Sequence, residues 1–268
     1  MKRTIFYLLL FITLQFLTYY PTVTVWLWVS GMPFSRATML ALHGQALVST
    51  PMVITTQLLF SILLIAVFLW RRYCEVSPGW LRSQGWIVLV WSAIVGIGTI
   101  IPSQALQEHL PPLPDMLRQT MMGVMNSPLG YLCIAILAPL SEEIVFRGAI
   151  ERQLLTSVRP FWAIVISAAL FALVHVNPAQ MPHAFIIGLI LGWMYYRTGS
   201  ILPGLALHWA NNTVAYLVIR LAPQYADANL TDIFGSQQRV IMAIAFSLLI
   251  IIPAILQLHL NMRRENSH

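Results

Sequence analysis

The sequence predicts an all-α membrane protein, a polytopic bundle of about eight transmembrane helices. Of its 268 residues, 58% are hydrophobic and only 9% are charged, whereas about 25% of residues are charged in a soluble domain. The apolar residues form charge-poor blocks of about 20 residues, the length that a helix needs to cross roughly 30 Å of hydrocarbon. Because these blocks are continuous and do not alternate with a period of two, a helical bundle is favoured over a β-barrel.

The apolar blocks can be followed in order along the chain. We expect spanning helices at 5–29, 51–70, 86–106, 128–155, 160–177, 181–197, 201–221 and 239–260. The first block is long and has no A-x-A site behind it, so we interpret it as a retained helix and not as a signal peptide. Residues 107–127 contain three prolines and are expected to form an outer loop that ends in an interfacial helix or a re-entrant segment. No repeat or second domain is visible, so residues 1–268 are interpreted as one membrane domain.

The basic residues predict the topology. Eight crossings place both termini on one side, and Lys and Arg accumulate on the cytoplasmic side of a membrane. Eleven basic residues fall on the side of the termini, namely Lys2, Arg3, Arg71, Arg72, Arg82, Arg147, Arg152, Arg159, Arg197, Arg263 and Arg264; four fall on the other, namely Arg36, Arg118, Arg220 and Arg239. We therefore expect a multi-pass protein of the cell membrane with both termini in the cytoplasm. The net charge of +6 is explained by these block ends, and no nucleic-acid partner is expected.

Polar side chains inside the blocks are few and concentrate on three of them. The block 128–155 contains Glu142, Glu143 and Arg147, the block 160–177 contains His175, and the block 201–221 contains His208, Asn211 and Asn212. An ionisable group at the centre of a bilayer costs roughly 2.5–3.5 kcal/mol on insertion scales, so such groups need a partner or a function. These residues are therefore the candidate functional site.

Helical spacing assigns different partners to the two glutamates. Glu143 and Arg147 are four residues apart with the acid first, which is the favourable order for an ion pair on one helix face. Glu142 is rotated by about 100° from Glu143 and has no basic residue at the neighbouring helical offsets. We therefore expect Glu143 to pair with Arg147, and Glu142 to find its partner on another helix.

The histidines and one amide complete a possible hydrolytic site. His208 and Asn212 share one face of their helix, and His175 shares a face with Phe171. A water molecule held between Glu142 and His175, and facing His208 and Asn212, would have a general base, an orienting group and donors for a developing oxyanion. The spacing therefore predicts that these side chains converge.

The motifs Glu142-Glu143-x-x-x-Arg147, Phe171-x-x-x-His175 and His208-x-x-x-Asn212, in this order, resemble the CAAX-protease and bacteriocin-processing family, which includes the Rce1-type prenyl-protein peptidases. The resemblance covers about residues 128–221, which we interpret as the catalytic core. It implies a glutamate-type intramembrane endopeptidase in which Glu142 and His175 activate water while His208 and Asn212 stabilise the oxyanion. Glu143, Arg147, Phe171 and Asn211 are assigned supporting roles. The implied partner is a peptide or protein substrate at the membrane.

The motifs of other intramembrane protease classes are absent from the sequence. The chain has no H-E-x-x-H motif for a zinc protease and no G-x-S for a rhomboid-like serine enzyme, and Asp115, Asp227 and Asp232 fall in expected outer loops. No cofactor is favoured. Zinc held by Glu142, His175 and His208 is the second choice, since two histidines and one carboxylate form a known catalytic zinc set.

The block 181–197 supplies no catalytic residue in this interpretation. His183, near its start, is interpreted as a loop residue. Gly188 and Gly192 form a G-x-x-x-G pair, which would let a neighbouring helix approach closely. Two unrelated glycines would give the same pattern.

A non-enzymatic membrane protein is the alternative to a peptidase. An immunity or scaffold protein would tolerate Glu142→Gln. A small transporter would use Glu142 and the histidines as a proton relay, and would show flux across proteoliposomes without a peptide product. Inverted repeats, which are typical of transporters, are not visible.

Overall fold

A computed structural model describes residues 2–75, 85–225 and 228–262. Within these ranges the chain forms helices, turns and loops, and no residue is in a β-strand. The all-α prediction is therefore confirmed for the part of the chain that the structure describes.

The helices are numbered along the chain. Before the motif region they are α1 (Lys2–Val29), α2 (Phe34–Leu42), α3 (Thr50–Trp70), α5 (Trp86–Gly98), α6 (Ile100–His109) and α7 (Arg118–Met125). One continuous helix follows, made of η1 (Leu132–Leu137), α8 (Ala138–Glu143), η2 (Ile144–Glu151) and α9 (Arg152–Leu155). The rest are α10 (Pro160–Leu173), α11 (Met181–Thr198), α12 (Leu202–Leu221), η3 (Pro223–Tyr225), α13 (Leu230–Phe234) and α14 (Gln237–Asn261).

Each expected block contains a helix, but the count of eight membrane crossings is not confirmed. Within the described ranges, four helices are long and apolar enough to span a membrane, namely α1, α3, α14 and the run Trp86–His109 formed by α5 and α6. The helix that carries the two glutamates is divided into α and π stretches, and α10 has only 14 residues. The helices α11 and α12, which contain polar residues such as His183 and Asn212, are not among these four.

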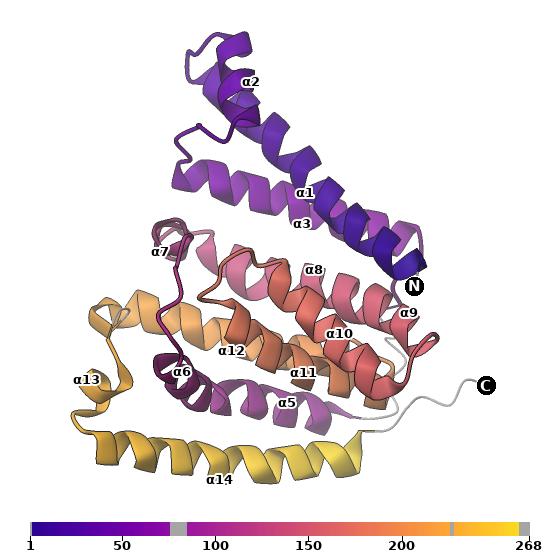
Figure 1. Cartoon of the computed structure of the whole chain (residues 1–268), viewed down its shortest axis with the longest axis vertical. Coiled ribbons are helices and arrows are strands. Elements are labelled where there is room, and N and C mark those ends of the chain that lie inside the picture. The colour runs from indigo at the N-terminus through magenta and orange to yellow at the C-terminus, as the bar shows by residue number, and fades with distance from the viewer. Residues whose placement is uncertain (1, 76–84, 226–227, 263–268) are drawn as a thin grey trace.

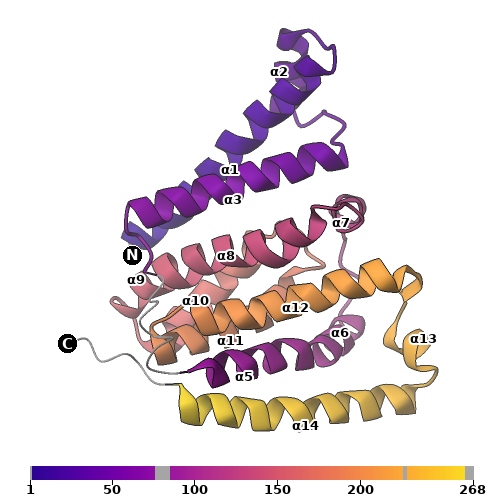
Figure 2. The same cartoon turned by 180° about the vertical axis from the view of Figure 1, so that it is seen from behind.

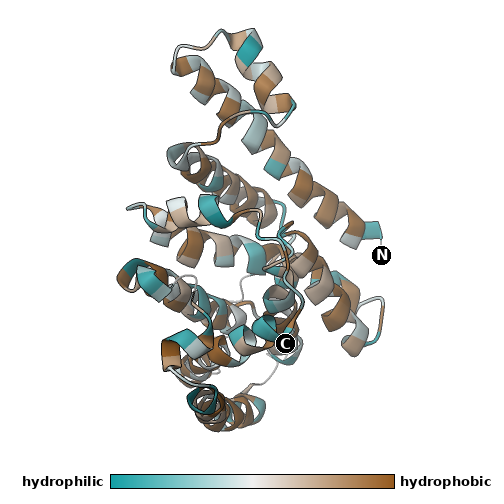
Figure 3. Ribbon diagram, turned by 60° about the vertical axis from the view of Figure 1, so that its left-hand side comes forward, coloured by the Kyte–Doolittle hydropathy of each residue, from teal (hydrophilic) through white to brown (hydrophobic). Residues whose placement is uncertain are grey.

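The apolar helices form two pairs, α1 with α3 and α5–α6 with α14, and the motif helices lie between the two pairs (Figure 1). On one side α1 packs against α3 and η2; on the other side α5 packs between α12 and α14 (Figure 2). Hydrophobic residues dominate α1 beyond its first turn (Figure 3). We call α1, α3, α5–α6 and α14 the shell, and the helices from η1 to α12 the core.

The start of α1 and the end of α14 lie on the same side of the molecule (Figure 1). Arg82, Arg263 and Arg264, which contributed to the charge count, lie outside the described residues. The cytoplasmic orientation of the termini stays a prediction. The expected helix at the end of residues 107–127 is present as α7.

Aromatic rings connect the shell to the centre of the core. Phe11 of α1 meets Phe146 of η2 edge to face at 5.6 Å between ring centroids, and Phe146 meets Phe171 of α10 at 5.3 Å. Such pairs contribute about 0.5–1.5 kcal/mol beyond their area burial. The chain of rings fixes Phe171, which lies beside the candidate site.

The two glycines of α11 provide the close helix approach that their spacing predicts. A Cβ atom at Gly188 would lie 3.0 Å from the Cβ of Ala168 in α10. One at Gly192 would lie 2.8 Å from Oε2 of Glu151 in η2. Larger residues at either position would separate the helices that frame the site.

Candidate active site

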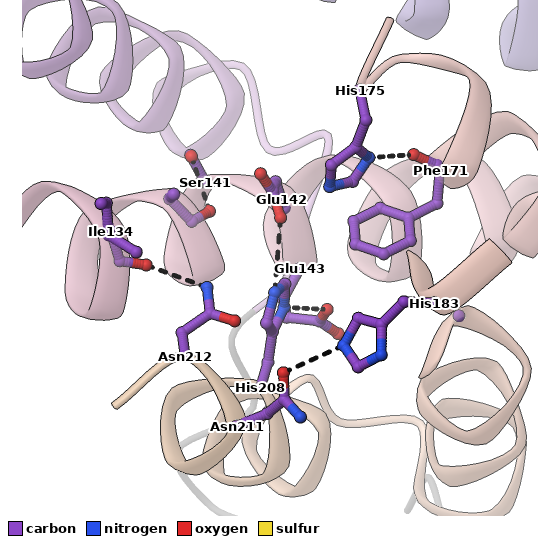
Figure 4. Close-up of polar contacts among 12 residues, drawn as sticks. Ile134, Ser141, Glu142, Glu143, Phe171, His175, His183, His208, Asn211 and Asn212 are labelled. Atoms are coloured by element: carbon purple, nitrogen blue, oxygen red, sulfur yellow. Dashed lines mark hydrogen bonds and ion pairs between the residues drawn. The ribbon is translucent and has the colours of Figure 1, made fainter. Parts of the chain in front are cut away.

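His208 lies at the centre of the site, between the two glutamates (Figure 4). Its Nε2 atom is 3.5 Å from Oε2 of Glu142, and its Nδ1 atom is 3.3 Å from Oε1 of Glu143. A neutral imidazole donates from one nitrogen only, so donation to both carboxylates requires the imidazolium form. Glu142 was expected to have a partner on another helix, and this partner is His208 of α12. Helical spacing did not predict the second contact, between His208 and Glu143.

Glu143 and Arg147 form the expected ion pair, and both side chains are completely buried. Their closest N–O distance is 3.4 Å. The guanidinium also donates to the carbonyl oxygen of Gly188 and lies 4.5 Å from the ring centroid of Phe171, a cation–π arrangement. Glu143 therefore links Arg147 to His208. Because Arg147 is buried in the core, it does not belong among the loop residues that report on topology.

α10 ends two residues before His175, so the expected helix 160–177 is too long. Its last residue is Leu173, and Nδ1 of His175 donates back to the carbonyl oxygen of Phe171 over 2.8 Å. A carbonyl oxygen only accepts, so this bond places the proton on Nδ1 and leaves Nε2 as the acceptor of the neutral ring. Val176 follows with a φ of 52°, which turns the chain away from the helix.

The neighbouring amides of α12 have different partners. Asn212 donates from Nδ2 to the carbonyl oxygen of Ile134 over 2.9 Å and keeps a second amide proton. Asn211 donates to the carbonyl oxygen of Gly96 over 3.3 Å and accepts from Nε2 of His183 over 3.2 Å. Asn212 is therefore the better placed of the two to donate to a bound molecule.

His183 is a residue that sequence reasoning misjudged. It lies in the first turn of α11 and not in a loop. Its Nδ1 atom meets the hydroxyl of Ser103 in α6, and its Nε2 atom donates to Asn211. Both contacts cross between helices, which helical spacing cannot reveal. The sequence feature that could have identified His183 is the presence of a histidine in a chain with few ionisable residues.

One cavity of about 380 Å³ joins the predicted residues. Glu142, His175, His208 and Asn212 all line it, although no direct contact between Glu142 and His175 is among those found in the described chain. Phe171, Asn211 and His183 contribute further wall. Apolar residues line most of this space, and its few polar side chains are hydrogen-bonding partners for bound water. We refer to this space as the Glu142 cavity.

The described residues contain no group of three or more His, Cys, Asp or Glu side chains arranged to hold a metal ion. Glu142, His175 and His208 line the cavity without forming such a group. The donor arrangement therefore gives the zinc interpretation no support of its own.

Glu151 is a second residue that the sequence interpretation missed. It is fully buried, and neither carboxylate oxygen has a hydrogen-bond partner. It follows Arg147 by four residues, so that Glu143, Arg147 and Glu151 form an acid–base–acid series along one helix. This four-residue spacing, continued from Arg147 to Glu151, is the sequence feature that could have identified Glu151.

Comparison with known proteins agrees with the motif-based resemblance. A family model described as type II CAAX prenyl endopeptidase Rce1-like matches residues 124–214, which include every motif residue. A protein of Escherichia coli described as an uncharacterized 24.3 kDa protein is 31% identical over 167 residues, covering 58% of this chain and 75% of that protein. No solved structure matches the chain significantly.

Proposed function

The chain belongs to the type II CAAX prenyl endopeptidase Rce1-like family, and on that basis we propose that it is an intramembrane endopeptidase that hydrolyses peptide bonds of membrane-associated substrates with an activated water. Family membership implies a CAAX-type peptidase and a peptide substrate at the membrane. The proposal adds the catalytic groups and their roles. Its main support is that His208, whose two ring nitrogens face Glu142 and Glu143, lines one cavity together with Glu142, His175 and Asn212.

Glu142 and His175 activate the water in this mechanism. The carboxylate of Glu142 and Nε2 of His175 are both acceptors, so each accepts a hydrogen bond from the water, and an oxygen lone pair stays available for the substrate carbonyl. Glu142 removes a proton as the water attacks. It then returns this proton to the leaving amine, so that the carboxylate is regenerated when the C–N bond breaks.

His208 and Asn212 stabilise the negative charge on the tetrahedral intermediate. Nε2 of His208 faces Glu142 before the reaction. Once Glu142 has taken the water proton and is neutral, the Nε2 proton of the His208 imidazolium is donated to the oxyanion, and Asn212 donates the amide proton that Ile134 does not use. Glu143 accepts from Nδ1 of His208 and so balances its positive charge. Removal of one such oxyanion donor costs about 10²–10³ in kcat in enzymes that use this device.

The proposal is tested with purified protein in detergent and a library of quenched peptides from membrane-protein sequences. We expect Glu142→Gln to lower kcat by about 10²–10⁴, the usual contribution of a general base. Glu75→Gln is the matched control, since Glu75 lies in an exposed ion pair with Arg152. Full cleavage by Glu142→Gln or by His208→Ala would contradict the mechanism, and mass spectrometry of the products identifies the bond.

Two further measurements separate the alternatives. A series of chelators in the same assay distinguishes metal-free hydrolysis from zinc chemistry with Glu142, His175 and His208 as ligands, because removal of a required ion abolishes turnover. The proton-coupled transporter is tested in proteoliposomes. Proton-coupled flux that is abolished by Glu142→Gln, together with the absence of any peptide product, would favour the transporter over the peptidase.

A further inference from the structure

A second cavity, of about 560 Å³, lies beside the Glu142 cavity between α6, α12 and α13. We propose that it is a substrate subsite for an apolar peptide segment that carries a basic residue, and that Asp115 recognises the positive charge. We call it the Asp115 cavity. This inference rests on the proposed peptidase function and adds the class of substrate.

The two cavities are neighbours through a shared wall. Gln180, His183, Asn211 and Ala215 line both of them. His183 and Asn211 are hydrogen-bonded to each other. His183 also hydrogen-bonds to Ser103, and Asn211 donates to the carbonyl oxygen of Gly96. This part of the wall is therefore fixed. A peptide with its scissile bond beside Glu142 has one flank directed toward the Asp115 cavity.

The Asp115 cavity is predominantly apolar along its length. Val214, Val218 and Ile219 of α12 form one side, and Leu230 and Phe234 of α13 form another. From Asn211 to Ala222 the α12 wall is roughly 16 Å long at 1.5 Å per residue. An extended peptide covers that distance with about five residues. The apolar lining selects apolar side chains among them.

Asp115 gives this apolar cavity a fixed negative charge. Among the described residues that line the cavity, no other is Asp, Glu, Lys or Arg. Its Oδ1 atom accepts from Nδ2 of Asn177 over 2.8 Å, and the Oδ1 atom of Asn177 accepts from the backbone of Met116 over 3.2 Å. Asn177 is completely buried, so the loop is held in place.

The same anchor ties Asp115 to the hydrolytic groups. Asn177 follows His175 by two residues, so the turn that carries the histidine also holds the acid. A Lys or Arg side chain bound at Asp115 is therefore only a few residues from the scissile bond. Charge and apolar surface together favour an apolar segment with a single basic residue over a neutral or acidic one.

The experiment uses an apolar quenched peptide that the protein cleaves. A single Lys is placed in turn at each of the five positions on either side of the scissile bond, and each peptide is paired with its Glu counterpart. At one position we expect kcat/KM to favour Lys over Glu by about two- to fivefold, the range for an exposed ion pair. This ratio should fall toward one in Asp115→Asn and reverse in Asp115→Lys. High salt should also reduce it.

Asp115→Asn keeps an oxygen that can accept from Asn177, so the fold of the loop is maintained. Asp232→Asn is the matched control, because Asp232 is an acid of α13 that does not line the cavity. A Lys preference that is absent, that survives in Asp115→Asn, or that Asp232→Asn lowers equally would overturn the inference. Binding of the fluorescent Lys and Glu peptides to the Glu142→Gln protein separates the two proposals. A Lys preference in binding without cleavage by the wild type supports the subsite and contradicts the peptidase.

Discussion

The shell and the core of this protein are held in place by different interactions. In the hydrophobic windows of the shell helices only 22–33% of the residues are buried, whereas every residue of η2 is buried. The shell therefore contributes apolar side chains directed outward, and the core contains buried charged side chains such as Glu143, Arg147 and Glu151. A hydropathy profile identifies the shell helices because their outward side chains are uniformly apolar. It does not identify the core helices, because their side chains are chosen for contacts with particular neighbours in the protein.

The largest difference between the two regions is expected for buried charge. Arg147→Met leaves Glu143 and Glu151 as buried carboxylates beside an uncharged side chain. Loss of one partner of a buried pair costs about 3–5 kcal/mol. We therefore expect a large fall in the thermal unfolding midpoint in detergent.

Arg152→Met on the same helix is the control for this variant. Its ion pair with Glu75 is exposed, with 43% and 69% of the two side-chain surfaces accessible, and such pairs contribute about 0–1 kcal/mol. Adding Glu143→Gln to Arg147→Met should recover part of the stability. Equal midpoints for the Arg147 and Arg152 variants would mean that burial of an ion pair does not determine how much it contributes to stability.

A smaller effect is expected where the two regions touch. A Cβ atom at Gly96 of α5 would clash with the carbonyl oxygen of Leu207 in α12. That oxygen belongs to the backbone, so Gly96→Ala must push a shell helix away from a core helix. Overpacking of this kind costs about 1–3 kcal/mol.

The displacement also reaches the site, because Leu207 precedes His208. We therefore expect Gly96→Ala to lower both the unfolding midpoint and the rate of peptide cleavage. Ile97→Ala, at an adjacent position that is 51% exposed, should change neither much. A wild-type rate in Gly96→Ala would indicate that the two regions are mechanically independent.

The same distinction explains how much of the structure the sequence predicts. The position of each apolar block and the Glu143–Arg147 pair are readable because they depend on spacing within one helix. The contacts of His183 with Ser103 and Asn211, and of Glu143 with His208, join different helices. They depend on how helices rotate against one another, which spacing along the chain does not specify.

The end of α10 shows the limit at a helix boundary. Apolar residues continue to Val176, so the sequence favours a helix up to residue 177. In the structure Nδ1 of His175 bonds to the carbonyl oxygen of Phe171, and buried Asn177 is anchored to Asp115 and Met116. Val176 lies between these two hydrogen-bonded residues and has a positive φ of 52°. Tertiary contacts here override the preference of a β-branched residue.

The contact between shell and core can also be tested at Cys74. Of the effects predicted, this one involves the smallest change in stability near neutral pH. Cys74 follows α3, and its sulfur lies against Gly148 of η2. Burial raises the pKa of this thiol from 9.0 to about 12, although Arg152 acts in the opposite direction. Because the thiolate is the reactive form, labelling at pH 8 should be roughly a thousandfold slower than for a thiol with a pKa of 9.0. The measurement uses Cys133→Ala protein, so that one thiol remains.

The raised pKa also fixes the direction of the pH dependence. The unfolded chain loses the thiol proton near pH 9 while the folded chain keeps it until about pH 12. The contribution of Cys74 to stability is therefore complete below pH 9 and is lost as the pH rises to about 12. At pH 10 the loss is about 1.4 kcal/mol, one pKa unit, and it should be absent in Cys74→Ala. Rapid labelling of the folded protein at pH 8 would instead mean that the end of α3 separates readily from η2, so that the shell is only loosely attached to the core at this point.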